Sequence, residues 1–189
     1  MTGPNGDATV TELALAAGRG DRAAAAAFVT ATQRDVWRFL AHLSSPAEAD
    51  DLTQETYLRA LRSLSTFAGR SSATTWLFTI ARRVAVDQVR AAAARPRLVT
   101  GGDWQRAVEM CRSGEAPRFE ESVVLRRLLD GLPAQRREAF VATQVLGLSY
   151  EEAARVCDCP VGTIRSRVAR AREDLVAAMT EPAHRLRSS

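Results

Sequence analysis

The sequence predicts an all-α protein of two helical domains, residues 10–95 and 119–180, joined by a flexible linker at 96–118. Apolar residues recur at helical spacing through both stretches. Residues 95–118 lose this periodicity and contain two prolines and three glycines, which interrupt helices. Near the C-terminus, a capped helix, a tight turn and a second helix follow one another in the order of a helix-turn-helix.

The composition excludes several classes of protein. With 189 residues, 46% of them hydrophobic, the chain can form one large or two small domains. Its net charge of +4 is compatible with a polyanionic partner. The sequence contains no apolar run of about 18 residues and no secretory signal, so we expect a cytoplasmic, soluble protein without membrane insertion. No nucleotide-binding loop, hydrolase elbow or paired-carboxylate motif is present, so we expect no cofactor and no catalytic residue.

The cysteines do not predict a disulfide framework or a metal site. Cys111, Cys157 and Cys159 are too few and too irregularly spaced for disulfides. Cys157 and Cys159 lack the second ligand pair of a structural zinc site, and both histidines are distant in the sequence. Packing inside the helix-turn-helix is the better explanation for Cys157.

The N-terminal domain is expected to follow a disordered tail, residues 1–9, which is polar and rich in turn residues. Helical periodicity then runs from Val10 to Leu43 with a break between Gly18 and Asp21, which predicts two helices. The second of these carries an amphipathic, core-forming set: Phe28, Val36, Trp37, Phe39 and Leu40.

A third helix is predicted over Glu48–Leu64. Helical spacing assigns Ala49, Leu52, Thr56, Ala60 and Leu64 to its buried side. A second stripe collects one leucine among acidic, amide and basic residues: Asp51, Gln54, Glu55, Leu58 and Arg62. This stripe is either a surface on which a partner docks or a solvated face with one stray leucine.

A fourth helix is predicted from Ala73 to Ala94. Its inward side consists of Trp76, Leu77, Ile80, Ala81 and Val84, and Asp87 also points inward, where it should pair with an arginine of a neighbouring helix. The opposite stripe carries hydroxyls and arginines: Thr75, Thr79, Arg82, Arg83, Val86 and Arg90. This stripe is suited to phosphate contacts, although an ordinary exposed face remains the alternative.

In the C-terminal domain, helices are expected over Phe119–Asp130 and Ala134–Leu146, with Gly147 as a cap. Ser149 is followed by Glu152 in a capping box, so the first helix of the helix-turn-helix should begin at Tyr150. The turn over 157–159 ends this helix, and Pro160 suits the first turn of the next one. The tail after Thr180 is expected to be loose.

The second helix of this motif has two different faces. One stripe is apolar: Val161, Ile164, Val168, Ala171 and Leu175. The opposite face is small, hydroxylated or basic, with three further arginines on its flanks: Gly162, Thr163, Ser166, Ala169 and Arg170, flanked by Arg165, Arg167 and Arg172. Such a face can enter a major groove, where arginine binds guanine or phosphate, and the alternative is a solvated basic face on a bundle helix.

Four segments together resemble the extracytoplasmic-function (ECF) sigma factors of bacterial RNA polymerase. They are ADDLTQETYLRA at 49–60, TWLFTIAR at 75–82, GLSYEEAA at 147–154 and CPVGTIRSR at 159–167. The resemblance extends over about 10–95, as the σ2 domain, and 119–180, as the σ4 domain. It implies a non-enzymatic promoter-specificity subunit whose partners are core polymerase, through the clamp helices of the largest subunit and the flap, and promoter DNA. An anti-sigma factor is a further potential partner.

The resemblance also implies roles for individual stripes. The core-docking residues would be Asp51, Gln54, Glu55, Leu58 and Arg62. The −10 strand would contact Thr75, Thr79, Arg82, Arg83 and Arg90. The −35 duplex would contact Gly162, Thr163, Arg165, Ser166, Arg167, Ala169 and Arg170.

This chain departs from the family pattern in ways that bear on promoter preference. Arg83 stands where many members have asparagine, and Thr74 where many have an aromatic or long side chain. Leu146 replaces a common glutamate, and Ala169 replaces a bulkier residue. Two other classes remain as alternatives: a helix-turn-helix regulator that binds an operator without polymerase, and an interaction protein that binds no nucleic acid.

Overall fold

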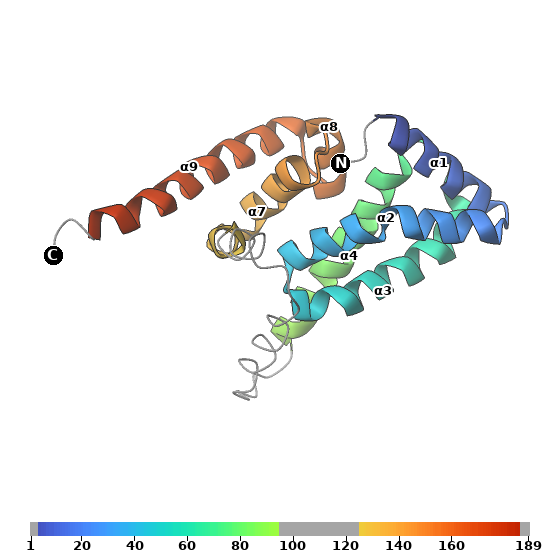
Figure 1. Cartoon of the computed structure of the whole chain (residues 1–189), viewed down its shortest axis with the longest axis horizontal. Coiled ribbons are helices and arrows are strands. Elements are labelled where there is room, and N and C mark those ends of the chain that lie inside the picture. The colour runs from blue at the N-terminus through green and yellow to red at the C-terminus, as the bar shows by residue number, and fades with distance from the viewer. Residues whose placement is uncertain (1–3, 95–124, 186–189) are drawn as a thin grey trace, which may run out of the picture.

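The computed structural model describes residues 4–94 and 125–185, and within these ranges the regular elements are all helical and no strand is present (Figure 1). The all-α prediction is therefore confirmed. The expected linker at 96–118 and the predicted start of a helix at Phe119 lie outside the described residues.

The N-terminal half consists of α1 (Pro4–Gly18), α2 (Arg22–Leu43), α3 (Pro46–Ser63), the short 3₁₀ helix η1 (Leu64–Thr66) and α4 (Ala73–Ala94). Asp21 caps α2, because its side chain accepts hydrogen bonds from the amides of Ala23 and Ala24. The predicted break before Asp21 is confirmed. Gly18 is required at the end of α1, since a Cβ there would lie 2.5 Å from the carbonyl oxygen of Leu64.

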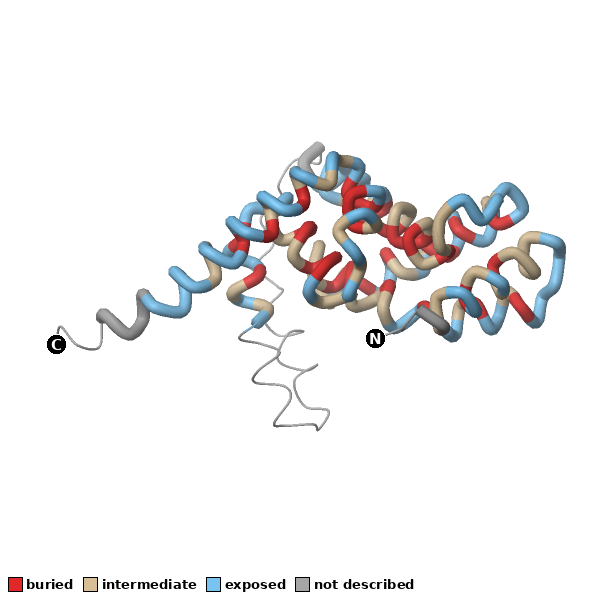
Figure 2. Tube along the Cα trace, turned by 90° about the horizontal axis from the view of Figure 1, so that it is seen from above, coloured by how far each residue is buried: buried red, intermediate tan, exposed pale blue. Residues whose placement is uncertain are grey.

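The core of this half is formed by α1, α2, α3 and α4, and Figure 2 shows the buried residues where the helices meet. The rings of Phe39 and Phe78 meet edge to face at 5.2 Å. The Tyr57 hydroxyl hydrogen-bonds to Thr32 at 2.7 Å, and burial raises the pKa of Tyr57 to about 12, so its hydroxyl stays protonated. The predicted buried side of α3 is confirmed for all its members: Ala49, Leu52, Thr56, Ala60 and Leu64.

Helix α4 confirms its predicted bounds and most of its inward side. Leu77, Ala81 and Val84 are buried, whereas Trp76 and Ile80 are half-buried, with Trp76 stacked on Phe67. Asp87 does accept a hydrogen bond from the neighbouring helix, from Arg59 at 2.7 Å. Its predicted inward position is wrong, however, because the carboxylate lies at the exposed edge between α3 and α4.

The N-terminal tail, residues 1–9, was predicted to be disordered, and this is wrong for residues 4–9, which belong to α1. Val10 and Ala14 are buried, so tertiary packing stabilises the helix that precedes them. The Thr11 hydroxyl donates to the carbonyl of Asp7 and accepts from the amide of Ala73 at 3.0 Å. The start of α1 is thereby bonded to the start of α4.

The C-terminal half begins with a helical segment at 125–130, followed by α7 (Ala134–Phe140), the π-helical turn η3 (Val141–Val145), α8 (Tyr150–Cys157) and α9 (Val161–Arg185). One helix was predicted over Ala134–Leu146, and the structure instead changes from α to π geometry after Phe140. The predicted loose tail is wrong for residues 181–185, because the backbone of α9 continues to Arg185. The end of α9 extends away from the rest of the molecule (Figure 1).

The helix-turn-helix forms as predicted. The Ser149 hydroxyl accepts from the Glu152 amide at 3.2 Å, and the Glu152 carboxylate accepts from the Ser149 amide at 2.9 Å. Asp158 ends α8 in the left-handed region, with φ of 51°. Ile164, Val168 and Ala171 are buried, while Val161 and Leu175 are half-buried, so the apolar stripe of α9 packs onto the domain as expected.

The two halves pack directly against each other. Helix α4 contacts α8, and α2 contacts α7 and η3. Leu129, Leu132, Val141, Val156 and Ala171 belong to the same buried cluster as the core of the N-terminal half. Arg126 adds a hydrogen bond to the carbonyl of Ala41 at 2.7 Å. The helix-turn-helix therefore packs on α4 through α8.

Replacing Ser149 with alanine should lower the free energy of unfolding by ~1 kcal/mol, because the amide of Glu152 loses its acceptor. A thermal melt of the full chain measures the change. Ser166→Ala is the matched control, since the Ser166 hydroxyl bonds only to the Thr163 carbonyl within α9. Equal melting temperatures for the two variants would contradict a stabilising role for the cap.

Candidate polymerase and nucleic-acid interfaces

The outer face of α9 is accessible along its first three turns. Gly162, Arg165, Ser166, Ala169 and Arg170 are exposed, and Thr163 is half-buried. They lie opposite Ile164 and Val168, whose burial sets the rotation of the helix. Gly162 has open space above its Cα, so a bound backbone can approach closely. The structure therefore presents this predicted face to solvent.

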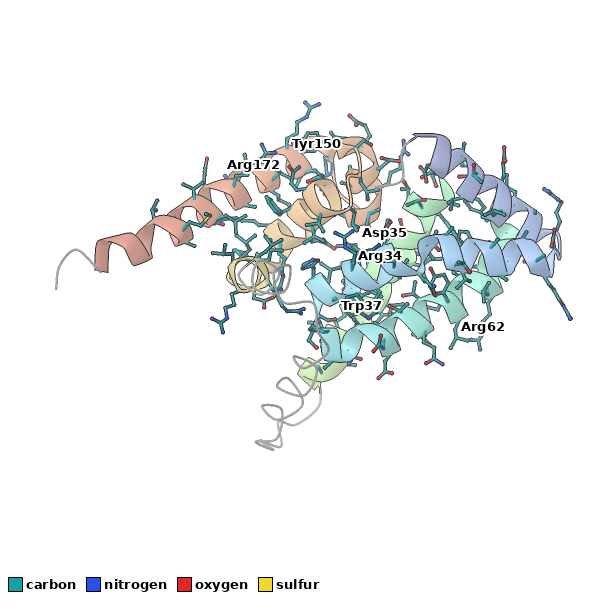
Figure 3. The ribbon with its side chains drawn as sticks, viewed as in Figure 1. Arg34, Asp35, Trp37, Arg62, Tyr150 and Arg172 are labelled. Carbon is teal, nitrogen blue, oxygen red and sulfur yellow. The ribbon has the colours of Figure 1, made fainter. Side chains whose placement is uncertain are left out.

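The flanking arginines of α9 are held by neighbouring helices. Arg167 donates to the side chain of Gln135 at 2.7 Å, and Arg172 donates to that of Gln144 at 2.9 Å. Gln144 belongs to η3, and Figure 3 labels Arg172 on α9. These two guanidinium groups are thus oriented within the domain, whereas Arg165 and Arg170 project from its surface.

The hydroxyl and arginine stripe of α4 is divided by tertiary packing. The expectation that Thr75 lies on an open face is wrong for this structure, because its side chain is only 2% exposed. Thr75 bonds to Ser72 at 2.9 Å and donates to Glu152 of α8 at 3.3 Å. Thr79 and Arg82 are half-buried, while Arg83 and Arg90 are exposed. Only part of the predicted stripe is therefore open.

Arg82 forms an ion pair with Glu138 of α7, in which the Arg82 Nε donates to the Glu138 Oε1. Glu138 is only 7% exposed, so this is a largely buried carboxylate. Burial of Arg82 opposes its charge, but the hydrogen bond and charge of Glu138, with Asp158 nearby, leave the pKa of Arg82 raised. Arg82 therefore remains charged at neutral pH. The pair joins the two halves of the molecule.

The mixed stripe of α3 faces solvent as predicted. Asp51, Gln54, Leu58 and Arg62 are exposed and Glu55 is half-buried, and Arg62 projects outward from α3 (Figure 3). Leu58 is 44% exposed. The sequence reasoning missed Leu61, which is also 44% exposed and lies three residues further on the same helix. The spacing could have identified Leu61 from the sequence, because residues three apart lie on the same side of a helix.

An open groove of about 390 Å³ runs beside this stripe, between α3 and α4. Four carboxylates line it, those of Glu48, Asp51, Glu55 and Asp87. Arg59 lies among them and bonds both Glu55 and Asp87 at 2.7 Å. The surface next to Leu58 is therefore acidic, which suits a partner with a basic rim.

Cys157 is a buried thiol in the helix-turn-helix. Burial, with the nearby charge of Glu138, raises the pKa of the Cys157 thiol to about 12, so it stays protonated and inert. No group of three or more potential metal ligands occurs among residues 4–94 and 125–185. Packing explains Cys157, as predicted, and Cys111 lies outside the described residues.

Two family models match the chain in the order of its two halves. The model for sigma-70 region 2 matches residues 28–95, which include α3 and α4. The model for sigma-70 region 4 matches residues 122–175, which include the helix-turn-helix. The ECF RNA polymerase sigma factor SigC of Mycobacterium tuberculosis is 51% identical over 171 residues, covering 90% of this chain and 91% of SigC.

The chain belongs to the ECF sigma factors.

Other relatives agree with this assignment. The ECF sigma factor EcfG of Rhodopseudomonas palustris is 41% identical over 142 residues, which cover 75% of this sigma factor and 77% of EcfG. The sigma factor RpoE of Bartonella quintana, solved in complex with the anti-sigma factor NepR, superposes with a TM-score of 0.62 at 28% identity. That match covers 80% of this chain and 94% of RpoE.

Region 2 of this sigma factor thus contains the stripe with Leu58 and the partly covered α4 face, and region 4 contains the exposed face of α9. None of the helices in the described ranges combines the length and apolarity that a membrane span requires.

Proposed function

We propose that this sigma factor binds core RNA polymerase through α3, reads the −10 element with region 2 and reads the −35 element with region 4. The observation that carries the proposal is the exposed face of α9, opposite the buried stripe of a capped helix-turn-helix, in a chain with sigma-70 regions 2 and 4 in order.

Core polymerase docks on the α3 stripe, where Leu58 is the apolar anchor. Leu58 and Leu61 are both 44% exposed and lie three residues apart, so together they offer an apolar contact that a partner can cover. The carboxylates of the adjacent groove supply charge complementarity, which steers the encounter. The clamp helices of the largest subunit take this surface, and the flap contacts region 4.

The −35 duplex accepts the N-terminal half of α9 in its major groove. Gly162, Thr163, Ser166 and Ala169 permit close approach because their side chains are small. Arg165 and Arg170 reach base edges or phosphates from this face. Arg167 contacts the duplex from the flank of this face, and its guanidinium also donates a hydrogen bond to Gln135.

The −10 strand lies along α4, where Arg83 and Arg90 are accessible and Thr75, Thr79 and Arg82 complete the contact surface after the halves separate. The sigma factor contributes no chemistry and binds no cofactor, because the polymerase carries out synthesis. Its place of action is the cytoplasm, where core polymerase transcribes. We also expect an anti-sigma factor to bind this protein, as NepR binds RpoE.

Arg83→Asn should change −10 sequence preference, because arginine only donates hydrogen bonds whereas asparagine both donates and accepts. Holoenzymes with either residue are compared on a library of randomised −10 elements. Arg22→Asn is the control, since it removes an exposed arginine of α2 that is not among the proposed −10 contacts. If Arg83→Asn lowers transcription evenly across the library, Arg83 only neutralises phosphate.

Transcription in vitro tests the proposed function as a whole. Purified full-length protein is added to core polymerase with a library of genomic fragments, and the start sites are mapped. The expected result is initiation at a limited promoter set that shares −35 and −10 elements. A regulator would instead protect an operator from cleavage without core polymerase, and that result would contradict the proposal.

A further inference from the structure

Arg167 of α9 is held by an uncharged partner. Its Nη2 donates to the Oε1 of Gln135, an exposed residue of α7, at 2.7 Å. Most other arginines with a side-chain partner in the described ranges pair with a carboxylate: Arg38, Arg59, Arg82, Arg126, Arg136 and Arg137. A glutamine carbonyl orients a guanidinium without cancelling its charge. Arg167 is therefore a fixed cation whose charge is still available to a ligand.

A second contact restricts the same guanidinium. The Nη1 of Arg167 donates to the Cys159 Sγ at 3.5 Å, and the Arg167 side chain is half-buried. Its remaining N–H donors form no hydrogen bond with any residue in the ranges 4–94 and 125–185. Two acceptors thus set the direction of the group, and the unused donors can bind an anion.

The position of Arg167 on α9 suits a DNA phosphate. Thr163 and Arg170 lie four residues before it and three residues after it, so the three are neighbours on one side of the helix. This side borders the outer face that is proposed to enter the major groove. The walls of that groove are the phosphate backbones, so a cation on the flank of the helix meets a phosphate rather than a base edge.

We propose that Gln135 is a positioning residue for the −35 contact, which holds the Arg167 guanidinium against a phosphate of the duplex while leaving its charge uncancelled. This inference rests on the proposed function, since it assumes that α9 enters the −35 major groove. Gln135 acts only through Arg167 and does not itself touch DNA.

Holding Arg167 in place strengthens binding without adding a contact. A long arginine side chain loses rotamer freedom when it binds a phosphate, and this loss is smaller where the folded protein already orients it. Phosphate contacts fix the register of a helix in the groove but do not depend on base sequence. Gln135 therefore affects affinity for every promoter, whereas the exposed Arg165 and Arg170 affect the choice of base.

Gln135→Glu separates this role from a purely structural one. Glutamate keeps the length of the side chain and the oxygen that accepts from Arg167, and its charge strengthens that bond. The fold should therefore be as stable or more stable, while the charge offered to a phosphate is cancelled. Gln33→Glu is the matched control, because Gln33 is exposed on α2 and is not among the proposed DNA or polymerase contacts.

Two quantities are measured for each full-length variant. Fluorescence anisotropy follows binding of each holoenzyme to labelled promoter fragments over a series of salt concentrations, and a thermal melt follows the stability of the sigma factor. We expect Gln135→Glu to bind all promoters about 10-fold more weakly, because a hydrogen bond to a charged group is lost. The slope of log binding constant against log salt concentration should fall by about one unit, without a lower melting temperature. Gln33→Glu should match the wild type in both.

A double-mutant cycle tests whether Gln135 acts through Arg167. In an Arg167→Ala background, Gln135→Glu should cause no further loss of promoter binding, because the residue that it positions is absent. An equal loss in that background would show that the introduced carboxylate repels DNA directly, and the positioning role would be wrong.

The remaining outcomes distinguish this inference from the proposed function. If the wild-type holoenzyme initiates at its promoters and Gln135→Glu has wild-type affinity and salt dependence, the Gln135–Arg167 bond is structural only, and the inference fails alone. If the wild-type holoenzyme initiates at no promoter set with a shared −35 element, the proposed function fails and the inference fails with it.

Discussion

Replacing Leu58 with arginine should abolish co-purification with core polymerase and leave the thermal melt almost unchanged. Leu58 is 44% exposed, so the folded chain gains little from it. Loss of a central apolar anchor weakens an interface by ~2 kcal/mol or more, and a charge in the same contact adds the cost of desolvation. The measurement is pull-down of core polymerase by tagged sigma factor, with a thermal melt of each variant.

The control for this change is Ala27→Arg. Ala27 is exposed on α2, so this variant adds the same arginine to the same half of the chain, away from the α3 stripe. It should retain core binding. Leu61→Arg should weaken binding as well, because Leu61 extends the same apolar area. Full retention of core by Leu58→Arg would identify the stripe as an ordinary solvated face.

Arg165→Ala or Arg170→Ala should relax base preference at one position of the −35 element. A bidentate contact from arginine to guanine is worth ~1–3 kcal/mol against a wrong base. Both side chains are exposed on the outer face of α9. We expect at least one of the two to show this loss. The assay is transcription by each holoenzyme from a panel of promoters with single −35 substitutions.

Arg167→Ala and Arg172→Ala are the matched comparisons. Both arginines are bonded to glutamines of the same domain, Gln135 and Gln144. Both variants should weaken initiation at all promoters to a similar extent. If a phosphate contact is lost, the slope of log binding constant against log salt concentration should fall by about one unit. If Arg165→Ala and Arg170→Ala also weaken initiation at all promoters to a similar extent, sequence preference at −35 does not depend on those arginines.

Local signals in the sequence were sufficient to predict α4, α8 and the rotation of α9. Ala73 and Ala94 bound α4 as expected, because a turn-rich loop precedes it and apolar spacing continues through it. The Ser149–Glu152 capping box located the start of α8, since capping involves only neighbouring residues. The rotation of α9 was also predictable, because Ile164 and Val168 define a single apolar face.

The start of α1 and the π turn η3 depended on tertiary packing. Residues 4–9 lack a strong helical signal, yet they are helical because Val10 and Ala14 are buried against the N-terminal core. The π turn after Phe140 has no sequence signature comparable to a cap. There the backbone departs from α geometry at Val141, whose side chain is buried in the shared core.

The sequence by itself determined most of the helices, the exposed stripes of α3 and α9, and the family to which the protein belongs. Only the tertiary structure decided which part of the α4 stripe is accessible. Helical periodicity assigns a residue to a face, but it carries no information about which distant segment covers that face. Thr75 and Arg82 were assigned to an open face, and they are covered because Glu138 and Glu152, 56 and 77 residues later, pack against them.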